Sequence, residues 1–66
     1  MRIRVNGQWQ ERPQEFTVSQ LLEGLSLEPR RVAIELNRQI VPRGRYGLIR
    51  LADNDELEIV TLVGGG

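Results

Sequence analysis

The residues of this sequence that could do chemistry are its last three, Gly64, Gly65 and Gly66, which directly follow an apolar stretch. A run of glycine buries nothing and adds little to a fold. Around a carboxylate, however, glycines leave the carbonyl carbon unhindered and let the chain pass through a channel too narrow for side chains. Residues 63–66 would reach at most about 13–14 Å when extended. We therefore expect the Gly66 carboxylate to be a reacting group that other proteins handle.

The composition excludes most side-chain chemistry. The 66 residues include no cysteine and no histidine, which removes disulfides, thiolate nucleophiles, the usual zinc ligands and the commonest general base. A chain of this length buries only roughly 60% of the surface that its unfolded form exposes, so a deep active site is not expected. We predict that the protein is not an enzyme and that it has no metal site and no bound cofactor.

Charge and hydropathy narrow the class of partner. Nine basic residues balance nine acidic ones, and a net charge of zero implies no basic surface for nucleic acid or an anionic membrane. The apolar runs are short, and the start M-R-I-R-V-N lacks the apolar segment of a signal peptide. We expect a cytoplasmic protein with no nucleic-acid partner and no membrane partner.

A carboxylate at neutral pH resists nucleophiles, so an acyl carrier needs a better leaving group, such as an adenylate made from ATP. The chain has no Walker-type glycine-lysine loop, because all its basic residues are arginine and its final glycines follow an expected strand with no helix after them. Activation is therefore expected on a partner. Codon bias is the favoured explanation for the missing lysines, and protection of an activated acyl group from lysine amines is the alternative.

The glycines have a second interpretation, as a frayed end or an addition from cloning. Two observations favour a functional role of the glycines over this second interpretation. The glycines abut an expected strand without a spacer, and Val60 and Leu62 are expected to point outward beside them. Exposed apolar residues beside a reactive tail indicate a docking surface.

The first element expected is a hairpin over R-I-R-V-N-G-Q-W-Q, because Asn6-Gly7 is a strong turn signal. A two-residue loop would pair Val5 with Gln8 and Arg4 with Trp9, which places Trp9 on the outward face beside arginine. A longer loop would turn Trp9 inward. The sequence leaves both open.

A helix is expected to begin at Val18, since Thr17 and Gln20 have the spacing of a capping box and Phe16 precedes the cap. Apolar residues recur along one helical face and predict packing against a sheet. The helix should end near Leu25 or Leu27. The apolar stripe consists of Val18, Leu21, Leu22 and Leu25.

The second half of the chain is expected to add strands. Residues 32–37 form a short aliphatic run, and residues 38–50 should contain short extended pieces and one helical turn. Asp53 and Asp55 flank a tight turn with Asn54 in the left-handed conformation, which we favour over a metal pair. In the last strand, one face is expected to carry Leu57, Ile59 and Thr61, and the other Glu56, Glu58, Val60 and Leu62.

This order of elements predicts an α+β fold, a mixed sheet of four or five strands with one main helix packed on one face. The first and last strands can lie side by side and parallel in the centre, because the elements between them supply the crossover. This is the β-grasp arrangement. We expect a single domain over residues 1–63 and a flexible glycine tail over 64–66.

The sequence also resembles the ThiS family, the ubiquitin-like β-grasp sulfur carriers of thiamine-thiazole biosynthesis, over essentially the whole chain. The resemblance rests on V-N-G at 5–7, F-T-V-S-Q-L-L at 16–22, A-I-E-L-N-R-Q-I-V-P-R at 33–43, D-N-D-E-L-E-I-V at 53–60 and the final V-G-G-G. The family commonly has D-G-D where this chain has D-N-D at residues 53–55, and it commonly has tryptophan where this chain has Tyr46. Both replacements are compatible with the fold.

The resemblance implies a cycle on the Gly66 carboxylate. A ubiquitin-activating-type enzyme adenylates it with ATP and magnesium, and sulfur from a donor such as a cysteine desulfurase displaces AMP. The resulting thiocarboxylate delivers sulfur to thiazole synthase. The carrier is thus a protein co-substrate and needs no cysteine of its own.

Three other functions stay open at this point. They are a small subunit of molybdopterin synthase, a protein-conjugating modifier and a non-catalytic β-grasp binding module. The candidate partner-docking residues are Val60, Leu62, Val63 and Arg43, whereas Ile40, Val41 and Pro42 are interpreted as packing and turn residues.

Overall fold

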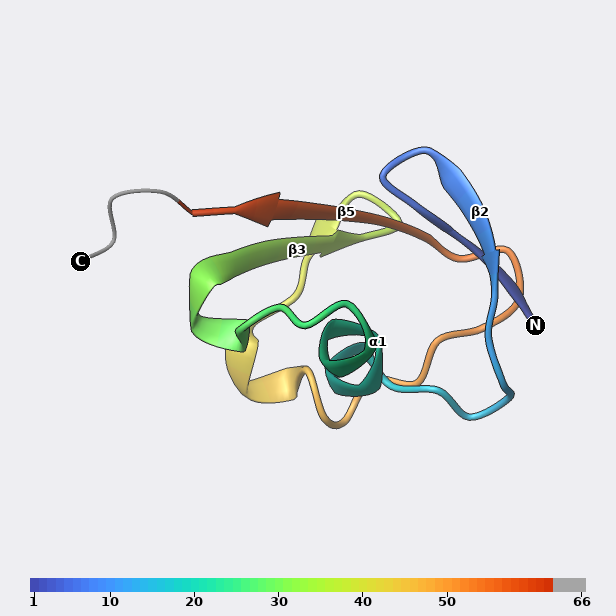
Figure 1. Ribbon diagram of the computed structural model, residues 1–66, viewed down its shortest axis with the longest axis horizontal. Coiled ribbons are helices and arrows are strands. Elements are labelled where there is room, and N and C mark those ends of the chain that lie inside the picture. Colours follow the sequence, from blue (N-terminus) through green and yellow to red (C-terminus); the bar gives the residue numbers. More distant parts are fainter. Residues whose placement is uncertain (63–66) are drawn as a thin grey trace.

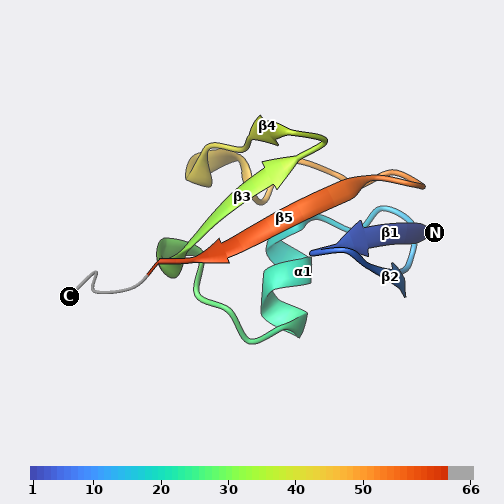
Figure 2. The ribbon, with the colours of Figure 1, turned by 90° about the horizontal axis from the view of Figure 1, so that it is seen from above.

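The computed structural model describes residues 1–62, which form a five-stranded sheet with one α-helix on one face (Figure 1). The sheet order is β2-β1-β5-β3-β4, so β5 lies in the middle (Figure 2). β1 and β5 run parallel, and every other neighbouring pair is antiparallel. The predicted α+β class, the mixed sheet and the parallel central pair are all confirmed. The strands are β1 (Arg2–Val5), β2 (Gln8–Glu11), β3 (Val32–Leu36), β4 (Gln39–Ile40) and β5 (Glu56–Thr61).

The β1–β2 hairpin has the two-residue loop. Asn6 and Gly7 both have positive φ, 48° and 84°, as a tight hairpin turn requires. Arg4 pairs with Trp9 and Val5 with Gln8. Trp9 therefore lies on the outward face, where the Arg2 guanidinium stacks 3.9 Å from the centre of its ring. This result decides between the two orientations that the sequence left open for Trp9.

Helix α1 (Val18–Gly24) begins where the capping box predicts. The Gln20 N–H donates to the Thr17 hydroxyl at 3.1 Å, and the Thr17 N–H donates to the Gln20 side-chain oxygen at 2.8 Å. The helix ends at Gly24 with Leu25 as its C-cap residue, slightly before the expected end. Its buried residues Val18, Leu21 and Leu22 face the sheet, and Phe16 and Leu25 pack at the edge of the core.

The core lies between α1 and the inner face of the sheet. Strand alternation supplies it, because every second residue of a strand points to the same face. The same rule leaves Val60 exposed on β5 while Leu57 and Ile59 are buried, as predicted. The buried core consists of Ile3, Val5, Val18, Leu21, Leu22, Val32, Ile34, Val41, Tyr46, Leu51, Leu57 and Ile59.

The segment between β3 and β5 contains β4, the short 3-10 helix η2 (Arg43–Arg45) and turns, in agreement with the expected mixed structure. The structure corrects one detail. Val41 is 6% exposed and packs in the core, but Ile40 is 72% exposed and does not. The two residues are neighbours on an extended chain, so their side chains point in opposite directions.

The turn before β5 uses its two aspartates as hydrogen-bond acceptors. Asn54 has φ 70°, the left-handed conformation that was predicted. Asp53 accepts from the Arg2 N–H at 2.7 Å, and Asp55 accepts from the Ala52 N–H at 2.7 Å. These contacts support the turn interpretation of Asp53 and Asp55.

No helix within residues 1–62 is long and apolar enough to cross a membrane.

Candidate functional site

Strand β5 carries the chain toward the predicted reacting group. It lies between β1 and β3 in the sheet, and it extends past the end of β1 (Figure 2). Gly64, Gly65, Gly66 and Val63 lie outside the described residues, so their predicted roles stay predictions. What the structure shows is how the strand that precedes them is held.

On the β3 side, β5 is paired from Leu57 to its last residue, Thr61. The register runs from Leu36 opposite Leu57 to Val32 opposite Thr61. One residue further, the Leu62 N–H donates to the Arg31 carbonyl at 2.7 Å. Arg31 is the last residue of η1 (Pro29–Arg31), a short 3-10 helix that leads into β3.

On the β1 side, backbone pairing ends early, with Val5 opposite Leu57. There the hairpin turns away, and the side chain of Asn6 continues the contact. Its Nδ2 donates to the Ile59 carbonyl at 3.1 Å, and its Oδ1 accepts from the Ile59 N–H at 2.7 Å. The sequence identified Asn6 only as a turn residue. Nothing local in the sequence indicates this second role.

The predicted docking pair lies on the outward face of β5, at Val60, and one residue beyond the end of that strand, at Leu62. Val60 is 57% exposed and Leu62 is 47% exposed. Ala33 lies opposite Val60 on β3, which extends the apolar surface across the sheet. We call Ala33, Val60 and Leu62 the outer apolar patch. It is formed at the end of the strand nearest the predicted tail.

Acidic residues border the outer apolar patch. Glu35 and Glu58 lie directly opposite each other on β3 and β5, and both are exposed. Glu56 makes an ion pair with Arg4, at 3.2 Å between guanidinium nitrogen and carboxylate oxygen. A partner that covers the patch would therefore meet apolar side chains next to the carboxylates of Glu35 and Glu58, and a complementary partner surface would carry positive charge opposite these two residues.

Arg43 lies in η2, and the structure gives it an internal contact. Its Nε donates to the Pro29 carbonyl at 3.2 Å, and one of its terminal nitrogens donates to the Arg30 carbonyl at 3.4 Å. The side chain therefore holds η1, from which Arg31 binds Leu62. A direct contact of Arg43 with a partner stays a prediction.

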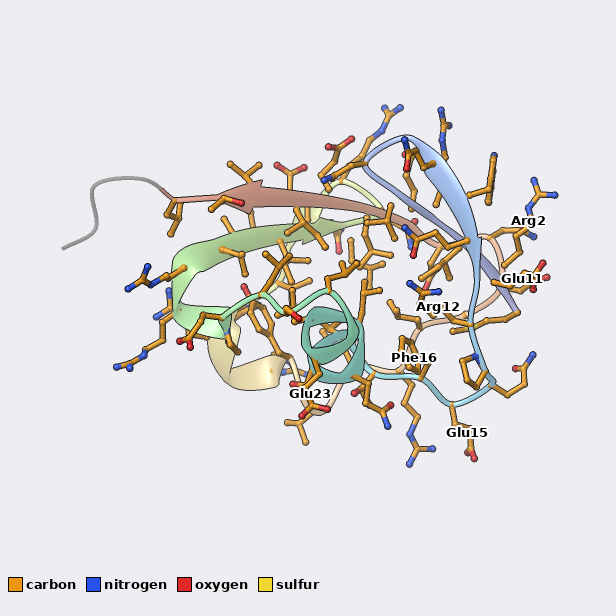
Figure 3. The ribbon with its side chains drawn as sticks, in the orientation of Figure 1. Arg2, Glu11, Arg12, Glu15, Phe16 and Glu23 are labelled. Atoms are coloured by element: carbon orange, nitrogen blue, oxygen red, sulfur yellow. The ribbon has the colours of Figure 1, made fainter. Side chains whose placement is uncertain are left out.

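Other charged residues gather at the opposite end of the molecule. Figure 3 shows Arg2, Glu11, Arg12 and Glu15 at the end of the long axis away from the final residues of β5. Arg12 lies over the Phe16 ring at 5.9 Å and hydrogen-bonds to Gln10, so its guanidinium belongs to the structure of that end. Within residues 1–62 no group of three or more acidic side chains could hold a metal ion.

Comparison with known proteins gives the chain a family context. The model of the ThiS family matches residues 3–66. The "Sulfur carrier protein ThiS" of Bacillus subtilis is 42% identical over 50 residues, which cover 76% of each chain. A crystal structure of a thiamine biosynthesis protein (ThiS) from Geobacter metallireducens superposes with a TM-score of 0.85 at 28% identity, and the match covers all of both chains.

A second group of relatives is much longer. A thiazole synthase of Magnetococcus marinus is 39% identical over 66 residues, which are all of this chain but only 20% of the relative. A thiazole synthase of Paramagnetospirillum magneticum matches over the same extent. The chain thus spans about a fifth of the length of these relatives, which contain a segment similar to the whole of it.

Proposed function

Because the chain belongs to the ThiS family, we propose that it is a sulfur carrier of thiamine biosynthesis, whose Gly66 carboxylate becomes a thiocarboxylate that donates sulfur for thiazole formation. The observation that carries the proposal is the family match, which extends through the final glycines to residue 66. The protein acts as a co-substrate that partner enzymes modify, rather than as a catalyst.

The geometry of β5 supports this role. A carrier must present its reacting end from a stable base, and β5 is the central strand of the sheet, with partners on both sides. Leu62 is tied to Arg31 and Ile59 to Asn6, so the strand is anchored close to the glycines in sequence. The outer apolar patch lies beside this base and provides a surface for partners.

The carboxylate needs activation before it can accept sulfur. We propose that an adenylating enzyme of the ubiquitin-activating type supplies it, using ATP and magnesium. A carboxylate oxygen of Gly66 attacks the α-phosphorus of ATP, and pyrophosphate leaves. The sulfur of a persulfide, supplied by a donor such as a cysteine desulfurase, then attacks the acyl carbon, and AMP leaves. The donor and the carrier are then joined by a sulfur–sulfur bond. A thiol attacks the sulfur on the donor side, a disulfide forms between that thiol and the donor, and the sulfur–sulfur bond to the carrier breaks, which releases the thiocarboxylate.

Thiazole synthase is the proposed recipient of the sulfur. Two bacterial thiazole synthases contain a segment similar to this entire chain. In these relatives the similar segment and the rest of the synthase belong to one chain, and covalent linkage raises the effective concentration of one part for the other. This arrangement supports a working contact between the carrier and the synthase. The proposed docking residues for this contact are Val60, Leu62, Val63 and Arg43. The cytoplasmic location of the protein stays a prediction.

The test is a reconstitution followed by intact mass spectrometry. The protein is incubated with the adenylating enzyme, ATP, magnesium, a cysteine desulfurase and cysteine. Replacement of oxygen by sulfur should add about 16 Da, and fragment ions should place the gain on Gly66. A variant that lacks Gly66 and a reaction without ATP are the controls. A mass gain in the variant that lacks Gly66 would reject the proposal.

Genetic complementation separates this function from the alternatives. A sulfur carrier for thiazole restores growth of a thiamine auxotroph, whereas a small subunit of molybdopterin synthase restores molybdoenzyme activity. A conjugating modifier would leave this chain on lysines of other proteins in a lysate. Replacement of Gly65 and Gly66 by alanine should abolish complementation, and an unchanged phenotype would favour the binding module.

A further inference from the structure

The side chain of Asn6 takes the place of one peptide unit of a neighbouring strand beside β5. At Val5 the backbone of β1 stops pairing with β5, and the hairpin turn begins. The Asn6 backbone N–H still donates to the Leu57 carbonyl at 2.9 Å. Its side-chain amide then makes one donor and one acceptor contact with Ile59, at 3.1 and 2.7 Å. An amide side chain offers the same two groups as a peptide unit, so it can extend a backbone ladder by one step.

The position of this contact on β5 matters. Asp55, Leu57 and Ile59 direct their backbone groups toward β1, as the bonds from Arg4 and Asn6 show. Residues 56 and 62 direct theirs toward the other side, where Asn37 and Arg31 bind them. Without the Asn6 amide, the N–H and carbonyl of Ile59 would lose their partners on a residue that is buried. A strand held on one side only would be freer to move at this end.

We propose that Asn6 is a positioning residue of the carrier reaction, because its amide holds β5 at Ile59 and so fixes where the chain leaves the sheet after Leu62. The inference rests on the proposed function. Leu62 is held on the other side by Arg31, so the two contacts together form a clamp on the strand. We call these contacts, Asn6 with Ile59 and Arg31 with Leu62, the strand clamp.

The strand clamp lies close to the reacting end in sequence. Gly66 follows Leu62 by four residues, so the position of Leu62 limits the region that the carboxylate can reach. A partner bound at the outer apolar patch would have to place that carboxylate beside its nucleotide. Misplacement of reacting atoms by about 1 Å can cost a large factor in rate. Loss of the Asn6 amide should therefore lower the turnover number while docking is unchanged.

Asn6 also has a local role, because its φ of 48° suits asparagine and glycine. The variant Asn6→Gly separates the two roles. Glycine adopts positive φ at least as well, so the hairpin turn is retained while the amide is removed. Asn54→Gly is the matched control. Asn54 also has positive φ, at 70°, but its backbone N–H rather than its side chain makes its hydrogen bond, to the Arg2 carbonyl.

The experiment combines amide hydrogen exchange with kinetics on the full chain. In Asn6→Gly we expect the Ile59 amide to exchange about tenfold faster, while the amide of Ile34 in β3 exchanges as in the natural sequence. Thiocarboxylate formation by the adenylating enzyme and sulfur donor should show kcat about tenfold lower and KM for the carrier within about twofold. Asn54→Gly should match the natural sequence in both measurements.

Three results would overturn the inference. They are unchanged exchange at Ile59 in Asn6→Gly, kcat within about twofold of the natural sequence, and an equal loss in Asn54→Gly. If the natural sequence acquires no sulfur at all, the proposed function fails instead, and so does a role of Asn6 in that reaction. The exchange at Ile59 then still decides whether Asn6 holds the strand.

Discussion

The backbone carbonyl of Arg31 accepts a 2.7 Å hydrogen bond from the N–H of Leu62, so the last described residue of the chain is tied to the short helix η1. Arg43 in turn donates to the carbonyls of Pro29 and Arg30 in η1. Arg43 therefore supports Leu62, the residue that precedes the predicted tail, indirectly: its side chain holds η1, and the Arg31 carbonyl of η1 binds Leu62. The relationship links Arg43, the last residue of the A-I-E-L-N-R-Q-I-V-P-R segment, to Leu62.

This relationship predicts the effect of Arg43→Gln. The change removes the contacts to η1, and we expect the amide of Leu62 to exchange about two- to fivefold faster because exposed hydrogen bonds contribute modestly. Arg45→Gln, in the same short helix and exposed, is the control and should leave exchange unchanged. If Arg43→Gln lowers affinity for the adenylating enzyme without any change at Leu62, Arg43 is a docking residue rather than an internal tether.

The outer apolar patch makes a prediction about partner binding. Val60→Asp places a charge in the centre of the patch, and we expect affinity for the adenylating enzyme to fall about tenfold or more. Isothermal titration calorimetry measures the change. Leu48→Asp is the matched control, since Leu48 is 73% exposed in the loop after η2, outside the patch. An equal loss in both variants would show that Val60 has no special part in docking.

The capping box at Thr17 is testable through stability. Thr17→Ala removes the hydroxyl that accepts from the Gln20 N–H at 3.1 Å. We expect the free energy of unfolding to fall by about 1 kcal/mol, as for other N-cap replacements. Urea denaturation followed by circular dichroism measures it. Ser19→Ala, within the first turn of α1, should change the midpoint much less, and a similar drop in both would argue against a specific cap.

Trp9 provides an optical probe of the far end of the sheet. Arg2 stacks on its ring at 3.9 Å, and Arg4 lies 5.9 Å from the ring centre. Arg2→Gln should change the fluorescence of Trp9 and lower the free energy of unfolding by about 0.5–1 kcal/mol, the range for exposed cation–π pairs. Because Trp9 is the only tryptophan, the signal has one source. An unchanged spectrum would mean that the stacking does not persist in solution.

Local signals in the sequence predicted the elements well. Asn6-Gly7 located the hairpin turn, and the two-residue loop that the structure shows then fixes how the two strands pair. The Thr17 and Gln20 spacing located the start of α1, because a capping box lies within one turn of the chain. Alternation along β5 predicted that Val60 and Leu62 would be exposed. These features depend on residues a few positions apart.

The sequence by itself therefore determined the elements, their order and the place where a reacting carboxylate was expected. Only the tertiary structure decided which distant side chains complete the ladder around β5. Asn6 and Ile59 are 53 residues apart, and Arg43 and Pro29 are 14 apart. Ile40 and Val41 look alike in sequence, yet one is exposed and the other buried. Such contacts arise when the sheet topology brings separate segments together, and no local pattern encodes that approach.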